Sequence, residues 1–315
     1  MTIISIFQRF AFIIIIIYGT ATSGACYDKD LESIFLRIYI GNTLHEYVDY
    51  SLENASAITS QIIKSKPTVM YIHGFMENVE KESVQLIVQG YLKRNDHNVM
   101  AVDYGTLANE SYMKLTTNAG RIGDALATAL DDMKRSGFDT EKLHIVAHSM
   151  GSQISGYIGR KVNFQIPRIT GLDPAGPLFH FFYHHLSSSD ARFVDLIHTD
   201  YGGYGITMTT GTVDFFPNGG KRIQPGCPLH PAFYSKNDFC SHHRSWRFYA
   251  ESLLNESAFL GVECSSLSHF KSDECRNNTQ IIMGYATPPN AKGIVYLTTN
   301  DHSPFGLNKK GLMAS

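Results

Sequence analysis

Ser149 lies between a short apolar run and a stretch of small residues, in the sequence KLHIVAHSMGSQISGYIGR (142–160). The partly β-branched run 143–147 predicts a strand, and 151–160 carries apolar side chains at helical spacing. A serine at such an abrupt turn takes a strained backbone conformation and presents its hydroxyl to an open cleft. Residues two positions away on either side must be small, and here they are Ala147 and Gly151, although the usual pattern has glycine at both. The spacing favours a nucleophilic serine over an ordinary serine in a strand–loop–helix joint.

A nucleophilic serine needs a carboxylate that orients its base, and the carboxylate follows the serine in chains with this turn. Asp173 ends the next predicted strand, in the segment GLDPAG. Asp200 ends another strand and is a rival. Asp195 lies inside a strand, which favours a structural role. The sequence therefore indicates Asp173 first and Asp200 second.

The base is harder to choose because the chain has 14 histidines. His242 and His243 follow Cys240 at a predicted helix start, where a disulfide would anchor them. The residues alone do not decide between these two. His198 and the cluster HFFYHH (180–185) are equally compatible with packing or surface roles.

Donors for a developing oxyanion would be main-chain N–H groups. The residue after the serine, Met150, supplies one. An early loop, YIHGFMENVE (71–80), supplies the other at Phe75, where the preceding Gly74 lets the main chain approach closely.

These residues require a scaffold of alternating strands and helices. Strands are predicted over 68–75, 98–104, 143–147, 167–176 and 192–200, with helices over 81–94, 118–136 and 151–160 and an antiparallel entry strand over 33–40. Near-continuous apolar strands of this kind form a mostly parallel sheet covered on both faces. Ser149 then lies at the carboxyl end of a strand, where the chemistry of such sheets is found.

Composition agrees with one globular domain over residues 26–315, since the 315 residues are 43% hydrophobic and 18% charged. A net charge of −2 gives no indication of a nucleic-acid partner. Cys227 and Cys240 are close in sequence, as are Cys264 and Cys275, which favours two local disulfides among three possible pairings. Cys26 is left over.

The first 25 residues predict a signal peptide. Arg9 precedes an apolar run over 10–18 that is too short to span a bilayer, and cleavage after Ser23 or Ala25 fits; an uncleaved anchor is the alternative. A secreted, extracellular protein without a transmembrane segment in its mature chain is expected. N-glycosylation sequons agree with this, at Asn54, Asn109, Asn255 and Asn277.

Taken together, these segments resemble the pancreatic-lipase-like family of secreted animal lipases and phospholipases A1, over roughly residues 30–308. The similarity is carried by YIHGF, AHSMGSQISG, ITGLDPAGP, FVDLIHTD, DFFPNGG (214–220), PGC (225–227), CSHHRS and SPFG (303–306). It implies an α/β-hydrolase fold, a single domain with a mostly parallel central sheet and helices on both faces. It also implies an enzyme that needs no cofactor.

Matched residue by residue, the resemblance makes Ser149 the nucleophile, Asp173 the acid and His242 the base, because the family pattern is Cys-x-His-x-Arg. Phe75 and Met150 become the oxyanion donors. Both cysteine pairings, Cys227–Cys240 and Cys264–Cys275, also fit the family, and the first closes the lid loop.

Two short loops resemble the phospholipase A1 branch. The lid between Cys227 and Cys240, PLHPAFYSKNDF, has twelve residues, and the loop YGGYGITMTTGTV (201–213) is also short for the family. A small lid leaves a charged head group room at the mouth of the cleft. The expected substrate is therefore a phospholipid cleaved at its sn-1 ester at a lipid–water interface. A neutral-lipid lipase is the alternative, and an inactive lipid-binding or yolk-type protein is a third.

The chain departs from larger relatives in two places. In the segment FHFFYHHLSSSD (179–190), where family members hold calcium, only Asp190 stands at a matching position, so no metal is expected there. A C-terminal β-sandwich domain is not seen, so partnership with colipase is not expected either.

Overall fold

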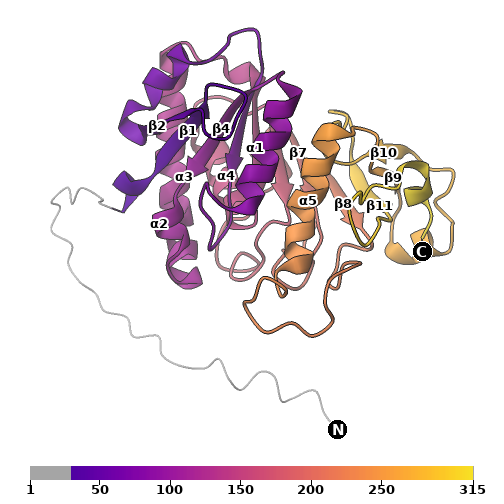
Figure 1. The fold of residues 1–315 in the computed structure, drawn as a ribbon. Coiled ribbons are helices and arrows are strands. Elements are labelled where there is room, and N and C mark those ends of the chain that lie inside the picture. Colours follow the sequence, from indigo (N-terminus) through magenta and orange to yellow (C-terminus); the bar gives the residue numbers. More distant parts are fainter. Residues whose placement is uncertain (1–29, 315) are drawn as a thin grey trace, which may run out of the picture.

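A computed structural model describes residues 30–314 (Figure 1). The predicted signal peptide, 1–25, and Cys26 lie outside the described residues. The described chain forms one eleven-stranded sheet in the order β10-β9-β11-β8-β7-β6-β5-β3-β4-β1-β2. The strands are β1 Phe35–Tyr39, β2 Tyr47–Ser51, β3 Thr68–Ile72, β4 Asn98–Asp103, β5 Leu143–His148, β6 Arg168–Leu172, β7 Phe193–Ile197, β8 Val213–Pro217, β9 Leu260–Glu263, β10 Gln280–Ile282 and β11 Gly293–Leu297.

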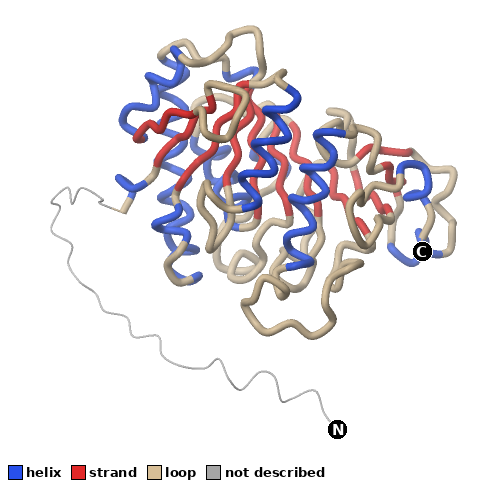
Figure 2. The backbone as a smooth tube through the Cα atoms, in the orientation of Figure 1, coloured by secondary structure: helices blue, strands red, loops and turns tan. Residues whose placement is uncertain are grey.

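Helices cover both faces of the sheet, as Figures 1 and 2 show. Alternate strand residues point to opposite faces, so Met70 and Ile72 of β3 join the core under α3 and α4, whereas Val69 and Tyr71 join the core under α1 and α5. The helices are α1 Glu82–Arg94, α2 Gly105–Ala108, α3 Tyr112–Arg135, α4 Met150–Lys161, α5 Cys240–Leu254 and α6 Leu267–Lys271.

The predicted fold class is confirmed. Strands β4, β3, β5, β6, β7, β8 and β11 are parallel, and antiparallel strands complete the sheet at both edges. The entry strand β1 is antiparallel to β4, as predicted. Within the described residues, no helix is long and apolar enough to cross a membrane.

Several predicted boundaries were wrong for local reasons. The helix predicted from 118 begins at Tyr112, because Ser111 caps it by accepting a hydrogen bond from the Lys114 N–H at 3.3 Å. The strand predicted over 167–176 ends at Leu172, because Asp173 turns the chain with φ 46°. Strands β2 and β8–β11 were not predicted.

The structure also shows where the disulfides, the sequons and the HFFYHH cluster lie. Cys227 is bonded to Cys240, and Cys264 to Cys275. Trp246 and Tyr249, both in α5, are buried in the core. All four sequon asparagines lie at the surface. In the HFFYHH cluster, Phe181 and Phe182 are largely exposed.

Candidate active site

Ser149 occupies the turn between β5 and α4 in a strained conformation, with φ 53° and ψ −118°. The turn is held because the Ser149 N–H donates to the Leu172 carbonyl at 3.0 Å, and the Ser149 carbonyl accepts from the Ala175 N–H at 3.1 Å. A Cβ at Gly151 would lie 2.3 Å from the carbonyl oxygen of Ile72. The sharp turn therefore brings α4 so close to β3 that a small residue is required there.

The side chains of His242 and Asp173 are both buried and meet directly. The distance from His242 Nδ1 to Asp173 Oδ2 is 2.5 Å. The other oxygen, Oδ1, accepts the main-chain N–H groups of Thr199 at 2.8 Å and Asp200 at 3.1 Å. These donors come from the loop after β7, and they fix the carboxylate so that its free oxygen faces the imidazole.

The rival carboxylates and histidines have other partners. Asp200 forms two 2.6 Å bonds with the Arg222 guanidinium, and Asp195 pairs with Arg168 at 2.8 Å. His198 Nε2 lies 2.7 Å from Asp214. These pairs leave Asp173 as the carboxylate that contacts the His242 ring.

His243, the open alternative to His242, points to another wall. Its ring stacks on Phe239 with centroids 5.6 Å apart. Burial lowers the pKa of His243 to about 3; His148 adds to this lowering and Glu77 partly opposes it. The residue is therefore a neutral lining group at neutral pH.

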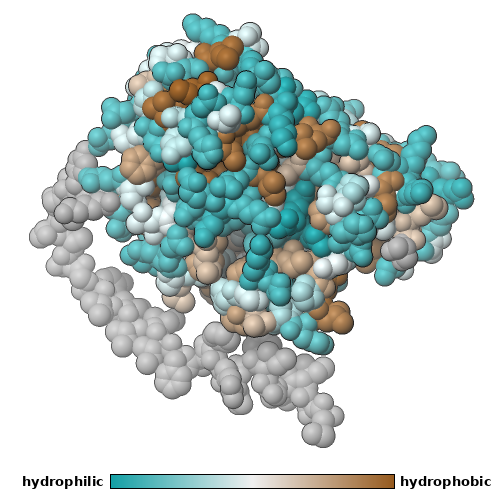
Figure 3. All heavy atoms as spheres, in the orientation of Figure 1, coloured by the Kyte–Doolittle hydropathy of each residue, from teal (hydrophilic) through white to brown (hydrophobic). Residues whose placement is uncertain are grey.

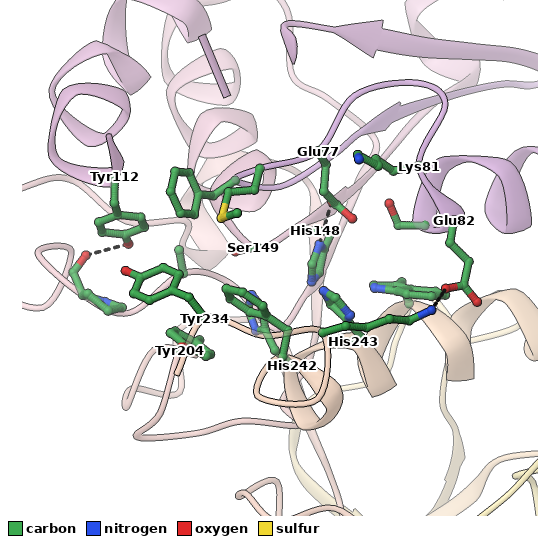
Figure 4. Close-up of a pocket in the computed structure, with 18 residues that line it drawn as sticks. Glu77, Lys81, Glu82, Tyr112, His148, Ser149, Tyr204, Tyr234, His242 and His243 are labelled. Atoms are coloured by element: carbon green, nitrogen blue, oxygen red, sulfur yellow. Dashed lines mark hydrogen bonds and ion pairs between the residues drawn. The ribbon is translucent and has the colours of Figure 1, made fainter. Parts of the chain in front are cut away.

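Ser149 and His242 line the same cleft, of about 450 Å³, at the carboxyl ends of the parallel strands (Figure 4). Phe75 lines it from the loop after β3, and Met150 is the first residue of α4, directly after the serine. The structure thus brings together the five residues that the sequence analysis named. Phe75 follows β3, Ser149 and Met150 follow β5, Asp173 follows β6, and His242 lies in α5. Asp173 lies behind His242.

A second buried pair adjoins the cleft, and sequence reasoning missed it. Glu77 accepts the Gly74 N–H at 2.7 Å and lies 3.2 Å from Nδ1 of His148. Burial alone would raise the pKa of Glu77, but the neighbouring imidazoles, led by His148, outweigh burial and lower it. The His148 ring is 4.7 Å from that of His242. No local pattern predicts a pair of residues 71 positions apart.

Two of the carboxylates at which a metal could bind are already paired with arginines. Asp173, Asp200 and His242 converge within 4.8 Å, but Arg222 already supplies the positive charge at Asp200. Asp190, the acidic residue considered above as a calcium ligand, accepts a hydrogen bond from the Arg160 guanidinium at 2.8 Å. Both arginines would repel a divalent cation.

The chain is similar over most of its length to known lipases. A family model described as Lipase matches residues 25–305. Pancreatic triacylglycerol lipase of Sus scrofa is 33% identical over 267 residues, covering 78% of this chain and 59% of that protein. Pancreatic lipase-related protein 2 of Mus musculus is 31% identical over 268 residues, covering 78% and 55%. The chain thus spans between half and two thirds of the length of these relatives.

Solved structures give partial matches. An alpha/beta hydrolase enzyme from a deep-sea metagenome library is 12% identical with a TM-score of 0.33, covering 54% of this chain and 72% of that one. A phospholipase/carboxylesterase from Dyadobacter fermentans is 12% identical with a TM-score of 0.31, covering 42% and 64%. These matches add nothing to the topology described above. The family match over residues 25–305 and the sequence relatives together show that the chain belongs to the pancreatic-lipase-like Lipase family.

Proposed function

We propose that the protein is a secreted carboxylic ester hydrolase that acts on lipids through Ser149, His242 and Asp173. The observation that carries the proposal is the 2.5 Å contact between His242 Nδ1 and Asp173 Oδ2, in a cleft that Ser149 also lines. With its Nδ1 proton donated to the carboxylate, His242 has Nε2 free to take the serine proton. This is the arrangement that acyl transfer from an ester to water needs.

The reaction proceeds in two displacements. Ser149 Oγ attacks the ester carbonyl while His242 takes its proton, and His242 then returns that proton to the departing alcohol oxygen. Water repeats the sequence on the acyl-enzyme, and fatty acid leaves. Asp173 holds the imidazole in the required tautomer throughout.

The N–H groups of Phe75 and Met150 are the proposed oxyanion donors. Met150 is the first residue of α4, so its N–H belongs to the unsatisfied, positively polarised end of that helix. The loop that carries Phe75 is braced by the Gly74–Glu77 hydrogen bond. Donors placed before the charge develops stabilise the transition state without reorganisation.

The proposed substrate is the sn-1 ester of a phospholipid. The lid over 228–239 is short, and the cleft beside Ser149 carries charged residues as well as aromatic ones. A neutral-lipid lipase is the second candidate, because the relatives named above include triacylglycerol lipases. Leu229 and Phe233 are exposed and give the lid apolar atoms that suit either lipid surface. Figure 3 shows hydrophobic atoms at the lower edge of this face, where Figure 1 places the loop before α5.

The test compares wild-type protein with Ser149→Ala on phosphatidylcholine labelled separately at sn-1 and sn-2, and on emulsified triolein. Serine-dependent release from sn-1 that exceeds triolein cleavage is the expected result. Dominant triolein cleavage would make the protein a neutral-lipid lipase. Lipid binding without turnover of any ester would make it a carrier and refute the catalytic proposal.

Secretion rests on the predicted signal peptide and is supported by the two disulfides and the surface position of the sequons. Detection of the glycosylated chain in the medium of expressing cells tests it; retention in the cell would contradict it. Activity without added colipase is part of the same proposal.

A further inference from the structure

The cleft has two chemically different ends, with Ser149 between them (Figure 4). On one side lie aromatic side chains, including Phe75, Tyr112 and Tyr234. On the other side lie the charged residues Lys81 and Glu82, which come from the start of α1. A substrate held across the serine would therefore place an apolar group at one end and a polar group at the other.

The polar end is built around the amino terminus of α1. Lys81 is the N-cap residue of this 13-residue helix, and no side chain caps the helix there. The first N–H groups of a helix lack intrahelical acceptors and favour an anion. Lys81, Glu82 and Ser83 all line the cleft, so this helix end opens onto it.

Ser83 provides independent evidence of a missing ligand. Ser83 is 1% exposed, and among the described residues the Tyr71 hydroxyl, also buried, is the polar group that its hydroxyl faces. Two facing hydroxyls can share only one of their protons, so one buried donor still lacks an acceptor. A buried polar group without a partner costs about 1–3 kcal/mol, so an oxygen acceptor bound at the helix end would relieve a real cost.

The surrounding charges favour an anion. Lys81 has no ion-pair partner among the residues that the structure describes, whereas Glu82 is bound by Arg247 at 2.8 Å. Lys236 reaches the same place from the lid, with Nζ 3.5 Å from Glu82. Glu77, the other carboxylate of this end, is occupied by Gly74 and His148. This end of the cleft thus has three cationic side chains and two carboxylates. The cations are Lys81, Lys236 and Arg247, and the carboxylates are Glu77 and Glu82.

We infer that this end of the cleft binds the phosphate of a glycerophospholipid head group. The helix terminus, the Ser83 hydroxyl and the Lys81 ammonium recognise the phosphate, while the scissile acyl chain lies against the aromatic end and its ester over Ser149. Lys236 closes the subsite from the lid. The inference deepens the proposed function and rests on it for the reaction, but it also makes a binding claim of its own.

The test uses two soluble esters with the same acyl groups, dibutyroyl phosphatidylcholine and tributyrin, below the concentrations at which they aggregate. Charge-assisted hydrogen bonds contribute about 1.5–3 kcal/mol, so Lys81→Glu should lower the ratio of kcat/KM for the phospholipid to that for tributyrin about 10-fold or more. Ser83→Ala should lower the same ratio severalfold. A purely structural Ser83 would leave the ratio unchanged.

Lys93→Glu is the matched control, because it makes the same charge change in the last turn of the same helix. It should leave the ratio at the wild-type value. If Lys81→Glu and Lys93→Glu give equal ratios, the phosphate subsite is refuted while ester hydrolysis by Ser149 stands. Tributyrin cleavage with no phospholipid cleavage by wild type would also refute the subsite.

A binding measurement keeps the two proposals separable. The Ser149→Ala protein is titrated calorimetrically with dibutyroyl phosphatidylcholine, with tributyrin and with inorganic phosphate. Tighter binding of the phospholipid that weakens on adding Lys81→Glu supports the subsite, even if no ester is turned over. Equal binding of phospholipid and tributyrin refutes it, and binding of inorganic phosphate alone would assign the subsite to a free anion instead.

Discussion

Gly151→Ala tests how tightly the serine turn packs against β3. A Cβ at this position would lie 2.3 Å from the carbonyl oxygen of Ile72 and 2.4 Å from that of His73. Both atoms belong to the main chain, so the methyl fits only if α4 moves away from the sheet. Overpacking of this kind costs about 1–3 kcal/mol or more, and the gain from helix propensity offsets at most about 1 kcal/mol.

We therefore expect the free energy of unfolding to fall by about 2 kcal/mol, which corresponds to a Tm lowered by about 3 °C for a chain of this length. Displacing α4 also displaces Ser149 from His242. A misplacement of about 1 Å reduces rates about 100-fold. Both quantities can be measured, by circular dichroism during heating and by hydrolysis of a soluble butyrate ester.

Gly120→Ala is the control, since it makes the same substitution inside α3. The nearest atom to a Cβ there is Cε1 of Tyr157, 3.3 Å away and at the end of a side chain that can move. This variant should be within about 1 kcal/mol of wild type. If Gly151→Ala matched Gly120→Ala in both Tm and activity, the close approach of α4 to β3 would be wrong.

Four further changes follow from the same contacts. Asp173→Asn should keep its fold but lose about 10⁴-fold in kcat because the His242 tautomer is wrong; ester hydrolysis within tenfold of wild type would contradict this. Because the folded-state pKa of His243, about 3, lies below its unfolded value, stability is lost as pH falls through about 6.5 towards 3. Chemical denaturation at pH 7 and pH 5 should then show a loss about 2 kcal/mol smaller in His243→Asn than in wild type; equal losses would refute the assignment. Arg222 contacts both Asp200 and the lid residue Asp238, so Arg222→Gln should make the lid over 228–239 more sensitive to limited proteolysis, and an unchanged cleavage rate would count against that link. Removing calcium with EDTA should leave activity nearly unchanged because Arg160 occupies Asp190; a loss that calcium restores would overturn this expectation.

Local signals predicted the parallel half of the sheet well. Strands β3 to β7 are short apolar runs, and helices with clear periodicity follow β3, β4 and β5, so their pattern can be recognised without tertiary information. Strands β8 to β11 are less regular, because no α-helix separates β10 from β11. They also include residues whose partners lie far along the chain. β11, for instance, pairs with β8 in parallel and with β9 in antiparallel orientation. Such pairing depends on the assembled sheet, and the pattern did not predict it.

Ser149 illustrates what the sequence by itself determined. Its neighbours Ala147 and Gly151, the strand before it and the helix after it are all local, and they indicate a strained turn at a strand end. The choice between Asp173 and Asp200, or between His242 and His243, was different. The residues alone left both open, and resemblance to the family selected one of each.

Only the tertiary structure shows the physical reason for that selection. His242 and Asp173 are 69 positions apart, and they meet because β6 ends and α5 begins at the same edge of the sheet. Asp200 lies beside them but is turned to Arg222, and His243 is turned to Phe239. The Glu77–His148 pair and the polar end of the cleft depend in the same way on loops that meet only after folding. Sequence spacing determines which residues can do chemistry, but the direction in which each side chain points is decided by the packing around it.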